Sequence, residues 1–334
     1  MRVHPIALSL PILAAAVLLR PSTAAAQNGI LLRYQPHERL VIHTTSSTTG
    51  DVRFALGGLV EMFAAIGQGM AEAFGDTSGI SVRDSLEAAV KQAGTDSMRI
   101  EMDLQQYFTE QVLARSGDET TVFRTVDSTT LRTRADKGWQ TTDPDELPTT
   151  SAQAIIDSRL RISDFRLVNA RPSQQDMGTV LRAPYGMIEV HLPEQAVAPG
   201  QSWSSDIAFP LSTLSRMEAE NSDPGLAPGD IISHARFTLD SLVDRGLDTL
   251  AYIRLRGVFE PTEESEDSAG VSGTITTQGS IAGTLVWSTG WSAFVTGGWR
   301  TELTLDVSMT MMGAKDPVTM GAQIDLVNRF VVEP

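Results

Sequence analysis

The chain has 334 residues and no cysteine, so it is long enough to bury a large core but has no disulfide framework and no thiolate metal site. Its 26 basic and 41 acidic side chains give a formal net charge of −15. A negative field of this size disfavours binding to nucleic acid and to anionic membrane surfaces.

Residues 1–26 have the layout of a secretory signal peptide. Arg2 precedes an apolar run from Pro5 to Leu19, and the small residues Ala24 to Ala26 form an A-x-A cleavage site. Arg20 and the short apolar run argue against an uncleaved membrane anchor, because a span needs about 20 apolar residues. We therefore predict an exported protein of the bacterial envelope, in the periplasm or outside the cell, without a transmembrane segment in its mature chain.

A first strand is predicted at 39–53, and two helices follow it. Residues 54–74, FALGGLVEMFAAIGQGMAEAF, place their large apolar side chains three and four positions apart, as an amphipathic helix does. The second helix is predicted at 81–93. A membrane span at 54–74 is not expected, because Glu61 and Glu72 would then lie in hydrocarbon.

Three roles are open for the helix predicted at 54–74. It can pack on a sheet as core, cover a ligand bound on that sheet, or lie on a membrane surface. The acidic polar face argues against the membrane surface, where Lys and Arg are expected. The candidate ligand-binding residues on its apolar face are Leu59, Met62, Phe63, Ile66, Met70 and Phe74.

Alternating apolar and polar residues predict strands in most of the remaining chain. The longest alternating run is 291–311, in which the odd positions are almost all apolar. The same pattern occurs at 98–112, 235–243, 251–259, 271–287 and 320–332. Turn residues between these runs predict antiparallel hairpins. Residues 151–160 are expected to form a weaker helix or an irregular arm.

Strands of about fifteen to twenty residues are too long to stay flat in a compact domain. We therefore predict a single domain at 27–334 that is mainly β with inserted helices (α+β). It is expected to be a large, strongly curved antiparallel sheet or half-barrel, with the two helices of an insertion at about 54–93 against its apolar face. Glycines inside the alternation are expected at bends or bulges; they are Gly273, Gly279, Gly283, Gly297 and Gly298.

The sequence contains no motif typical of an enzyme. His37 and His43 share one face of a predicted strand, but six residues of strand separate them by about 20 Å, too far to share a metal. His191 and His234 are isolated, and no G-x-S-x-G, S-x-x-K or P-loop motif occurs. We therefore predict no catalytic residue, no metal ligand and no cofactor.

Acidic runs and tryptophans are the remaining candidates for a site. The run 260–267, EPTEESED, lacks the ligand spacing and the central glycine of an EF-hand, so a solvated loop is expected there. Trp291 and Trp299 lie on the apolar face of a predicted strand. They are expected to be core first, and they join the helix residues as candidates for contact with a hydrophobic ligand.

Two segments carry a family resemblance. LPEQAVAPGQSW, from Leu192 to Trp203, and the G-x-x-x-G-x-x-x-W-x-x-x-G-W run from Gly279 to Trp291 resemble uncharacterised secreted bacterial β-rich proteins. That group implies no particular activity. In shape, the expected sheet is similar to the half-barrels of periplasmic lipoprotein carriers and lipid-binding proteins, which enclose an apolar cavity; no residue role is carried over from them.

These patterns favour a non-enzymatic protein that binds a hydrophobic ligand between the curved sheet and the helices. The ligand is expected to be a lipid, an acyl chain or a lipoprotein. The alternative is an envelope structural or protein-interaction module whose core is filled by its own chain. The volume available beside the apolar face distinguishes the two hypotheses.

Overall fold

The structure is a computed structural model that describes residues 29–55, 97–135, 138–141, 151–168, 190–209, 231–268, 271–311 and 318–333. The predicted signal peptide lies outside these residues. Among the described residues there is no helix with the length and apolarity needed to cross a membrane.

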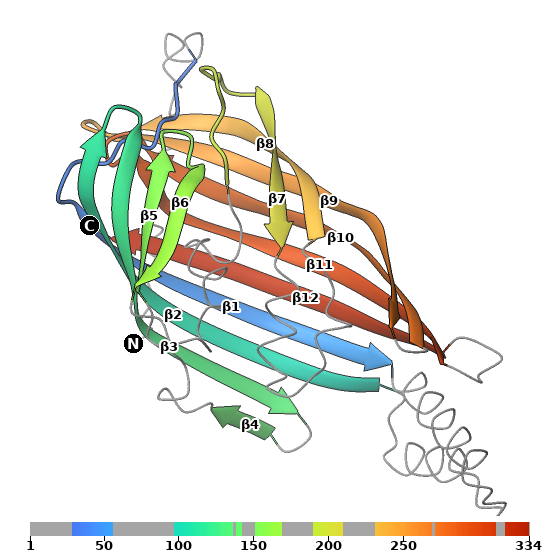
Figure 1. Cartoon of the computed structure of the whole chain (residues 1–334). Helices are drawn as coiled ribbons and strands as arrows, with labels where there is room; N and C mark the ends of the chain where they lie inside the picture. Colours follow the sequence, from blue (N-terminus) through green and yellow to red (C-terminus); the bar gives the residue numbers. More distant parts are fainter. Residues whose placement is uncertain are drawn as a thin grey trace, which may run out of the picture.

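Twelve strands form one antiparallel sheet (Figure 1). They are β1 (Val41–Ala55), β2 (Ser97–Ser116), β3 (Glu119–Ala135), β4 (Gly138–Thr141), β5 (Ser151–Asp157), β6 (Ile162–Val168), β7 (Ser202–Phe209), β8 (Ile231–Asp244), β9 (Thr249–Ser268), β10 (Val271–Ser288), β11 (Ala293–Met311) and β12 (Val318–Glu333). Their order is β6-β5-β3-β2-β1-β12-β11-β10-β9-β8-β7, with β4 paired to β3. The sheet is open, with β6 and β7 as its edges, and Figure 1 shows it curving so that both edges come to one side.

The antiparallel sheet predicted from the alternation is confirmed, but the predicted fold class is wrong. The described residues form an all-β sheet and contain no helix, so the α+β class with two helices against the apolar face is not supported. The start predicted for the first helix is also wrong, because β1 continues to Ala55. The other residues of the two predicted helices lie outside the described residues. Residues 151–157, expected to be a helix or an irregular arm, form strand β5.

One face of most strands is buried, and this face becomes the inner, concave side of the sheet. In β8, Ala235, Phe237 and Leu239 are fully buried, while the residues between them are more exposed. The same alternation runs through β1, β9 and β12. Inner-face side chains from most strands join one hydrophobic cluster. Period-two patterning therefore sets both the strands and the side of the sheet that holds the core.

Glycines on the inner face allow close packing where β10 and β11 meet. A Cβ atom on Gly283 would collide with the carbonyl oxygen of Gly298 and would lie 2.5 Å from Cβ of Trp299. A Cβ atom on Gly297 would lie 2.6 Å from the ring of Phe330. The register of β10 against β9 also shifts beside Gly279, which confirms a bulge predicted there. Side chains converge on the concave side of a curved sheet, so residues without a side chain are needed at these points.

Two extended segments, 29–40 and 190–201, lie across one end of the sheet, which we call the closed end. The backbones of Ile30 and Val197 exchange hydrogen bonds of 2.8 and 2.9 Å, so the two segments pair with each other. The N–H of Leu192 donates to the carbonyl oxygen of Arg159 beside β5, and that of Gly200 donates to Leu239 in β8. The segment 190–201 thus connects the two sides of the open sheet. Extended chain, rather than the expected helices, buries the apolar face at this end.

Candidate functional site

At the closed end, the protein's own side chains fill the inner face. Leu32, Tyr34 and Leu192 from the two extended segments are at most 1% exposed. They join the same cluster as Phe237 of β8 and Val332 of β12. No room for a ligand is expected among these residues.

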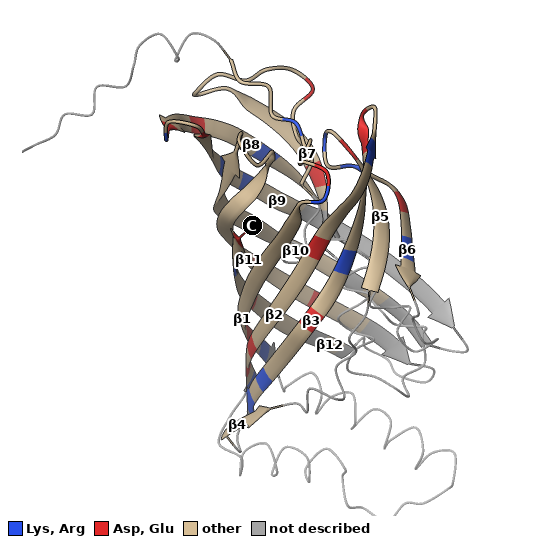
Figure 2. Cartoon of the chain, turned by 90° about the vertical axis from the view of Figure 1, so that its left-hand side faces the viewer, with Lys and Arg blue, Asp and Glu red and all other residues tan. Residues whose placement is uncertain are grey.

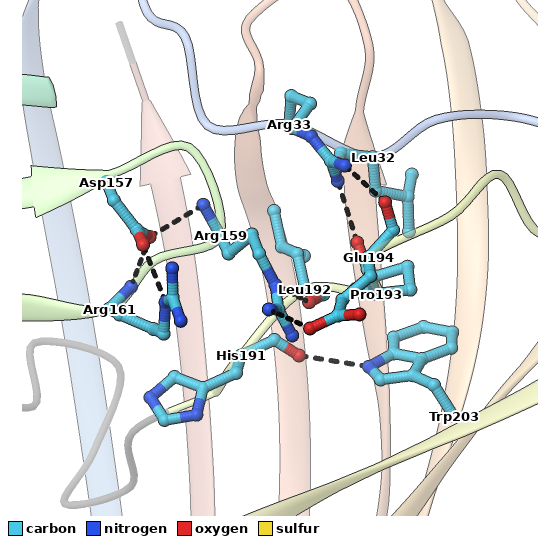
Figure 3. Close-up of polar contacts among 10 residues, drawn as sticks. All are labelled: Leu32, Arg33, Asp157, Arg159, Arg161, His191, Leu192, Pro193, Glu194 and Trp203. Atoms are coloured by element: carbon cyan, nitrogen blue, oxygen red, sulfur yellow. Dashed lines mark hydrogen bonds and ion pairs between the residues drawn. The ribbon is translucent and has the colours of Figure 1, made fainter. Parts of the chain in front are cut away.

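Polar contacts fix the two segments in place (Figure 3). The guanidinium group of Arg33 donates to the carbonyl oxygens of Pro193, at 2.7 Å, and Glu194, at 2.5 Å. Arg159, from the turn between β5 and β6, donates to the carbonyl oxygen of Leu192 at 3.1 Å and to the carboxylate of Glu194 at 2.7 Å. Trp203 donates its indole N–H to the carbonyl oxygen of His191 at 2.9 Å. These contacts explain the LPEQAVAPGQSW segment as a structural element that closes one end of the sheet.

Farther along the inner face, large apolar side chains are only half-buried. We call them the inner apolar patch: Val52, Ile100, Met102, Leu104, Leu131, Leu305, Val307 and Ile324. Val52 of β1 lies directly opposite Ile100 of β2 and Ile324 of β12, so these side chains are neighbours across strands. The patch extends over the adjacent strands β3, β2, β1, β12 and β11. It therefore continues the buried core as a band of apolar surface that water still reaches.

A group of polar side chains lies on the inner face next to this band, beside the other buried polar residues Thr44, Ser46 and Gln106 of β1 and β2. We call it the inner polar patch: Thr48, Trp299, Thr301 and Asn328. Trp299 lies opposite Asn328, and Asn328 lies opposite Thr48. The hydroxyl of Thr48 donates a 2.6 Å hydrogen bond to Oδ1 of Asn328. All four residues are buried, with at most 3% of their surface exposed.

Two polar atoms of the inner polar patch have no hydrogen-bond partner in the part of the chain that the structure describes. They are the indole Nε1 of Trp299 and the hydroxyl Oγ1 of Thr301. The two residues are two positions apart in β11, so both point to the inner face. Buried donors without partners are rare in folded proteins, and each costs about 1–3 kcal/mol.

The outer face carries a row of carboxylates held by arginines. Glu101, Asp51 and Asp325 are direct neighbours across β2, β1 and β12. Figure 2 shows acidic and basic positions next to one another on β1, β2 and β3. Arg99 donates to Asp51 at 2.7 Å, and Arg300 donates to Asp325 at 2.8 Å. Like charges directly opposite one another destabilise a sheet, so these arginines allow the row to exist.

The negative charges of the carboxylates in this row are nearly compensated by the positive charges of the neighbouring arginines. Partial burial would raise the pKa of Asp51, but the hydrogen bonds from Arg99 and Arg53 outweigh that effect and hold this pKa below its ordinary value. A solvent-open hollow of about 610 Å³ lies beside this row, over residues of β1, β9, β10, β11 and β12, and Arg300 and Glu302 line it together with Asp51 and Arg53. Its carboxylates and guanidinium groups bind each other, so we assign this network a structural role.

The predicted ligand-binding residues are placed as follows. The six from the predicted helix lie outside the described residues, so their role stays a prediction. Trp299 is in the inner polar patch. Trp291 lies in the turn between β10 and β11, where its backbone N–H donates to the hydroxyl of Ser288 at 3.0 Å. Six residues of β11, about 20 Å, separate the start of that strand from Trp299, so the two tryptophans do not form one site.

Sequence reasoning missed Thr48, Thr301 and Asn328. The signal was present for Thr301, because it is the polar residue that breaks the run of apolar odd positions in 291–311. Thr48 was harder to find, because β1 carries Thr or Ser at every position from 44 to 49. Without the strand register, no pattern singles out the inward residues.

The described histidines do not form a metal centre. His43 is exposed on the outer face, with Nδ1 3.1 Å from the hydroxyl of Thr109. His234 is also exposed and lies 2.5 Å from the carboxylate of Asp206. No group of His, Asp and Glu able to hold a metal ion occurs in the described ranges.

No model of a known protein family matches the chain, and no curated protein sequence matches it. The resemblance to secreted bacterial β-rich proteins therefore stays a prediction from motifs.

Proposed function

We propose that this protein binds a hydrophobic ligand, a lipid or an acyl chain, on the concave inner face of its sheet, without catalysing a reaction. The observation that carries this proposal is the inner apolar patch. Eight large apolar side chains from five adjacent strands lie side by side there and are only half-buried. Contiguous apolar surface that remains accessible on a soluble protein is typical of an interaction site.

The curvature supports a ligand that is long and flexible. A binding site for an apolar molecule is concave and mostly apolar, and the concave face of this sheet has that chemistry. Each buried methylene group stabilises a complex by about 0.8 kcal/mol. About fifteen methylenes therefore give about 12 kcal/mol. A cost of association of about 4 kcal/mol leaves about 8 kcal/mol, which corresponds to a micromolar dissociation constant.

The alternative function, an interaction module with a filled core, has one observation in its favour. At the closed end, segments 29–40 and 190–201 already fill the inner face. If the whole inner face is filled in this way, no small molecule binds there. The protein would then act through its surface, and its partner would be another protein of the envelope.

A titration with a neutral apolar dye separates these two functions. N-phenylnaphthylamine is suitable, because its fluorescence rises when it moves from water to apolar surroundings. The mature chain, 27–334, is expected to bind the dye saturably with a micromolar dissociation constant, and methyl oleate is expected to displace it. A fluorescence increase that does not saturate, or dye that methyl oleate does not displace, would contradict the proposal.

The cellular location stays a proposal that rests on residues 1–26. A charged start, an apolar run and an A-x-A site support export with cleavage after Ala26. The mass of the protein recovered from the producing cell's envelope or medium tests this directly. The expected N-terminal residue is Gln27.

A further inference from the structure

The inner polar patch contains hydrogen-bond donors, which a purely apolar ligand does not need. Trp299 and Thr301 are 3% and 1% exposed, yet the indole N–H of Trp299 and the hydroxyl of Thr301 have no partner among the described residues. None of their described cross-strand neighbours accepts from these two donors. Thr301 lies between Ile281 and Leu326, and Trp299 lies between Gly283 and Asn328, whose Oδ1 already accepts from Thr48.

We propose that Trp299 and Thr301 donate hydrogen bonds to an uncharged oxygen acceptor of the ligand, such as the carbonyl of an ester-linked acyl chain. This inference rests on the proposed function, and it narrows the ligand class from any hydrophobe to a neutral lipid ester. The acyl chain extends over the inner apolar patch, and its carbonyl group lies at the inner polar patch.

The acceptor is uncharged because the described residues of the inner face offer no unpaired buried cation. The buried charged side chains of the described inner face are Glu110 of β2 and Arg124 of β3, and they bind each other. The carboxylate of Glu110 is bound by Arg124 at 2.5 Å and by Tyr34 at 2.7 Å. A buried carboxylate of a free fatty acid would therefore have donors but no cation, which is costly, whereas an ester carbonyl needs only the donors.

The test compares how three molecules with the same chain length displace N-phenylnaphthylamine: methyl oleate, oleic acid and octadecene. The protein is the mature chain in its original form and as the variants Thr301→Val and Trp299→Phe. Each variant has a matched control that makes the same exchange elsewhere. Thr304→Val is on the outer face of the same strand, and Trp139→Phe is an exposed tryptophan in β4.

The original protein is expected to prefer methyl oleate over octadecene by about tenfold or more, since two hydrogen bonds are each worth about 0.5–1.5 kcal/mol. It should also prefer methyl oleate over ionised oleate. Thr301→Val should reduce the preference over octadecene by about fivefold without lowering the melting temperature of the ligand-free protein. Removing an unpaired buried hydroxyl while keeping the shape of the side chain does not destabilise the folded protein. Both controls should keep the preference.

Several outcomes would overturn this inference while leaving the proposed function standing. One is that methyl oleate and octadecene displace the dye equally well, which would mean that the two donors bind water only. Another is that Thr301→Val lowers the melting temperature by several degrees, which would mean that the protein itself satisfies the hydroxyl. If the dye does not bind at all, the proposed function fails and this inference fails with it.

Discussion

The phenol oxygen of Tyr34 donates a 2.7 Å hydrogen bond to Oε1 of Glu110, whose other carboxylate oxygen accepts from Nε of Arg124 at 2.5 Å. All three residues are buried. Segment 29–40, β2 and β3 thus meet at one carboxylate. A buried ion pair is stable only when its remaining hydrogen-bonding positions are filled, and Tyr34 fills one of them.

Replacing this tyrosine therefore tests how the closed end is held. Tyr34→Phe is expected to lower the free energy of unfolding by about 1.5–3 kcal/mol, because a charged acceptor loses a buried donor. Urea unfolding followed by circular dichroism measures the change. Tyr107→Phe is the matched control, since Tyr107 is 44% exposed on the outer face of β2. Equal effects of the two substitutions would show that the contact of Tyr34 with Glu110 does not stabilise the closed end.

Asp248 joins two neighbouring turns. It follows the turn after β8 and accepts hydrogen bonds from the hydroxyl of Ser288 at 2.6 Å and the backbone N–H of Gly290 at 2.7 Å. Partial burial would raise the pKa of the Asp248 carboxyl, but these hydrogen bonds and that from Thr289 outweigh it and hold the pKa below its ordinary value of 3.8. The ionised form is therefore favoured by folding.

The stabilisation that this carboxylate provides should be lost at low pH, where the carboxylate becomes protonated. Because the folded pKa is lower than the unfolded pKa, the stabilisation is complete above the unfolded value and is lost as the pH falls through the folded value. Asp248→Asn should lower the free energy of unfolding by about 1–3 kcal/mol at about pH 7, and the difference should shrink at about pH 2.5. Asp118→Asn, at an exposed turn, is the control. If the difference in the free energy of unfolding between the original protein and Asp248→Asn is independent of pH, the ionised carboxylate of Asp248 is not the source of the stabilisation.

The close approach of β10 and β11 predicts a third effect. Gly283→Ala should destabilise the protein by about 1–3 kcal/mol, because the new methyl group would collide with the carbonyl oxygen of Gly298. Gly321→Ala in β12 is the matched control, since its nearest neighbour would be 3.4 Å away. Thermal unfolding compares the two. A neutral Gly283→Ala would mean that the strands separate easily and that the inner face is not tightly curved there.

The inner apolar patch predicts a fourth effect, on binding rather than on stability. Ile324→Asn places a polar amide within the patch, so it should weaken N-phenylnaphthylamine binding by about tenfold, because burial of a side chain of this size contributes about 1.5–3 kcal/mol. Val331→Asn in the same strand is the control, because Val331 is 50% exposed on the outer face. Circular dichroism confirms that both variants are folded. Equal affinities of the two variants would place the dye away from the inner face.

Much of the sheet could be predicted from the sequence because it depends on local pattern. The run predicted at 291–311 appears as β11, which begins two residues later at Ala293 because Trp291 belongs to the turn. Strand β5 was missed, although its burial alternates perfectly. Two of its three buried residues are Ala152 and Ala154, whose small side chains give little apolar signal.

The closed end and the inner polar patch could not be predicted, for a different reason. Leu192 looks like a loop residue beside Pro193, and it is buried only because the turn after β5 hydrogen-bonds to it. Asn328 becomes notable only when the register places it between Trp299 and Thr48. Contacts between residues far apart in the chain decide both features, and periodicity carries no information about them.

The most direct test of the proposed function is mass spectrometry of organic extracts from the gently purified mature protein, together with the native mass of the intact protein. Binding on the inner face predicts one lipid per chain, seen both as a mass increment on the native protein and as a lipid in the extract. The further inference predicts that this lipid carries an ester or another uncharged carbonyl group. A native mass equal to that of the bare chain, with no lipid in the extract, would contradict ligand binding and favour a filled core.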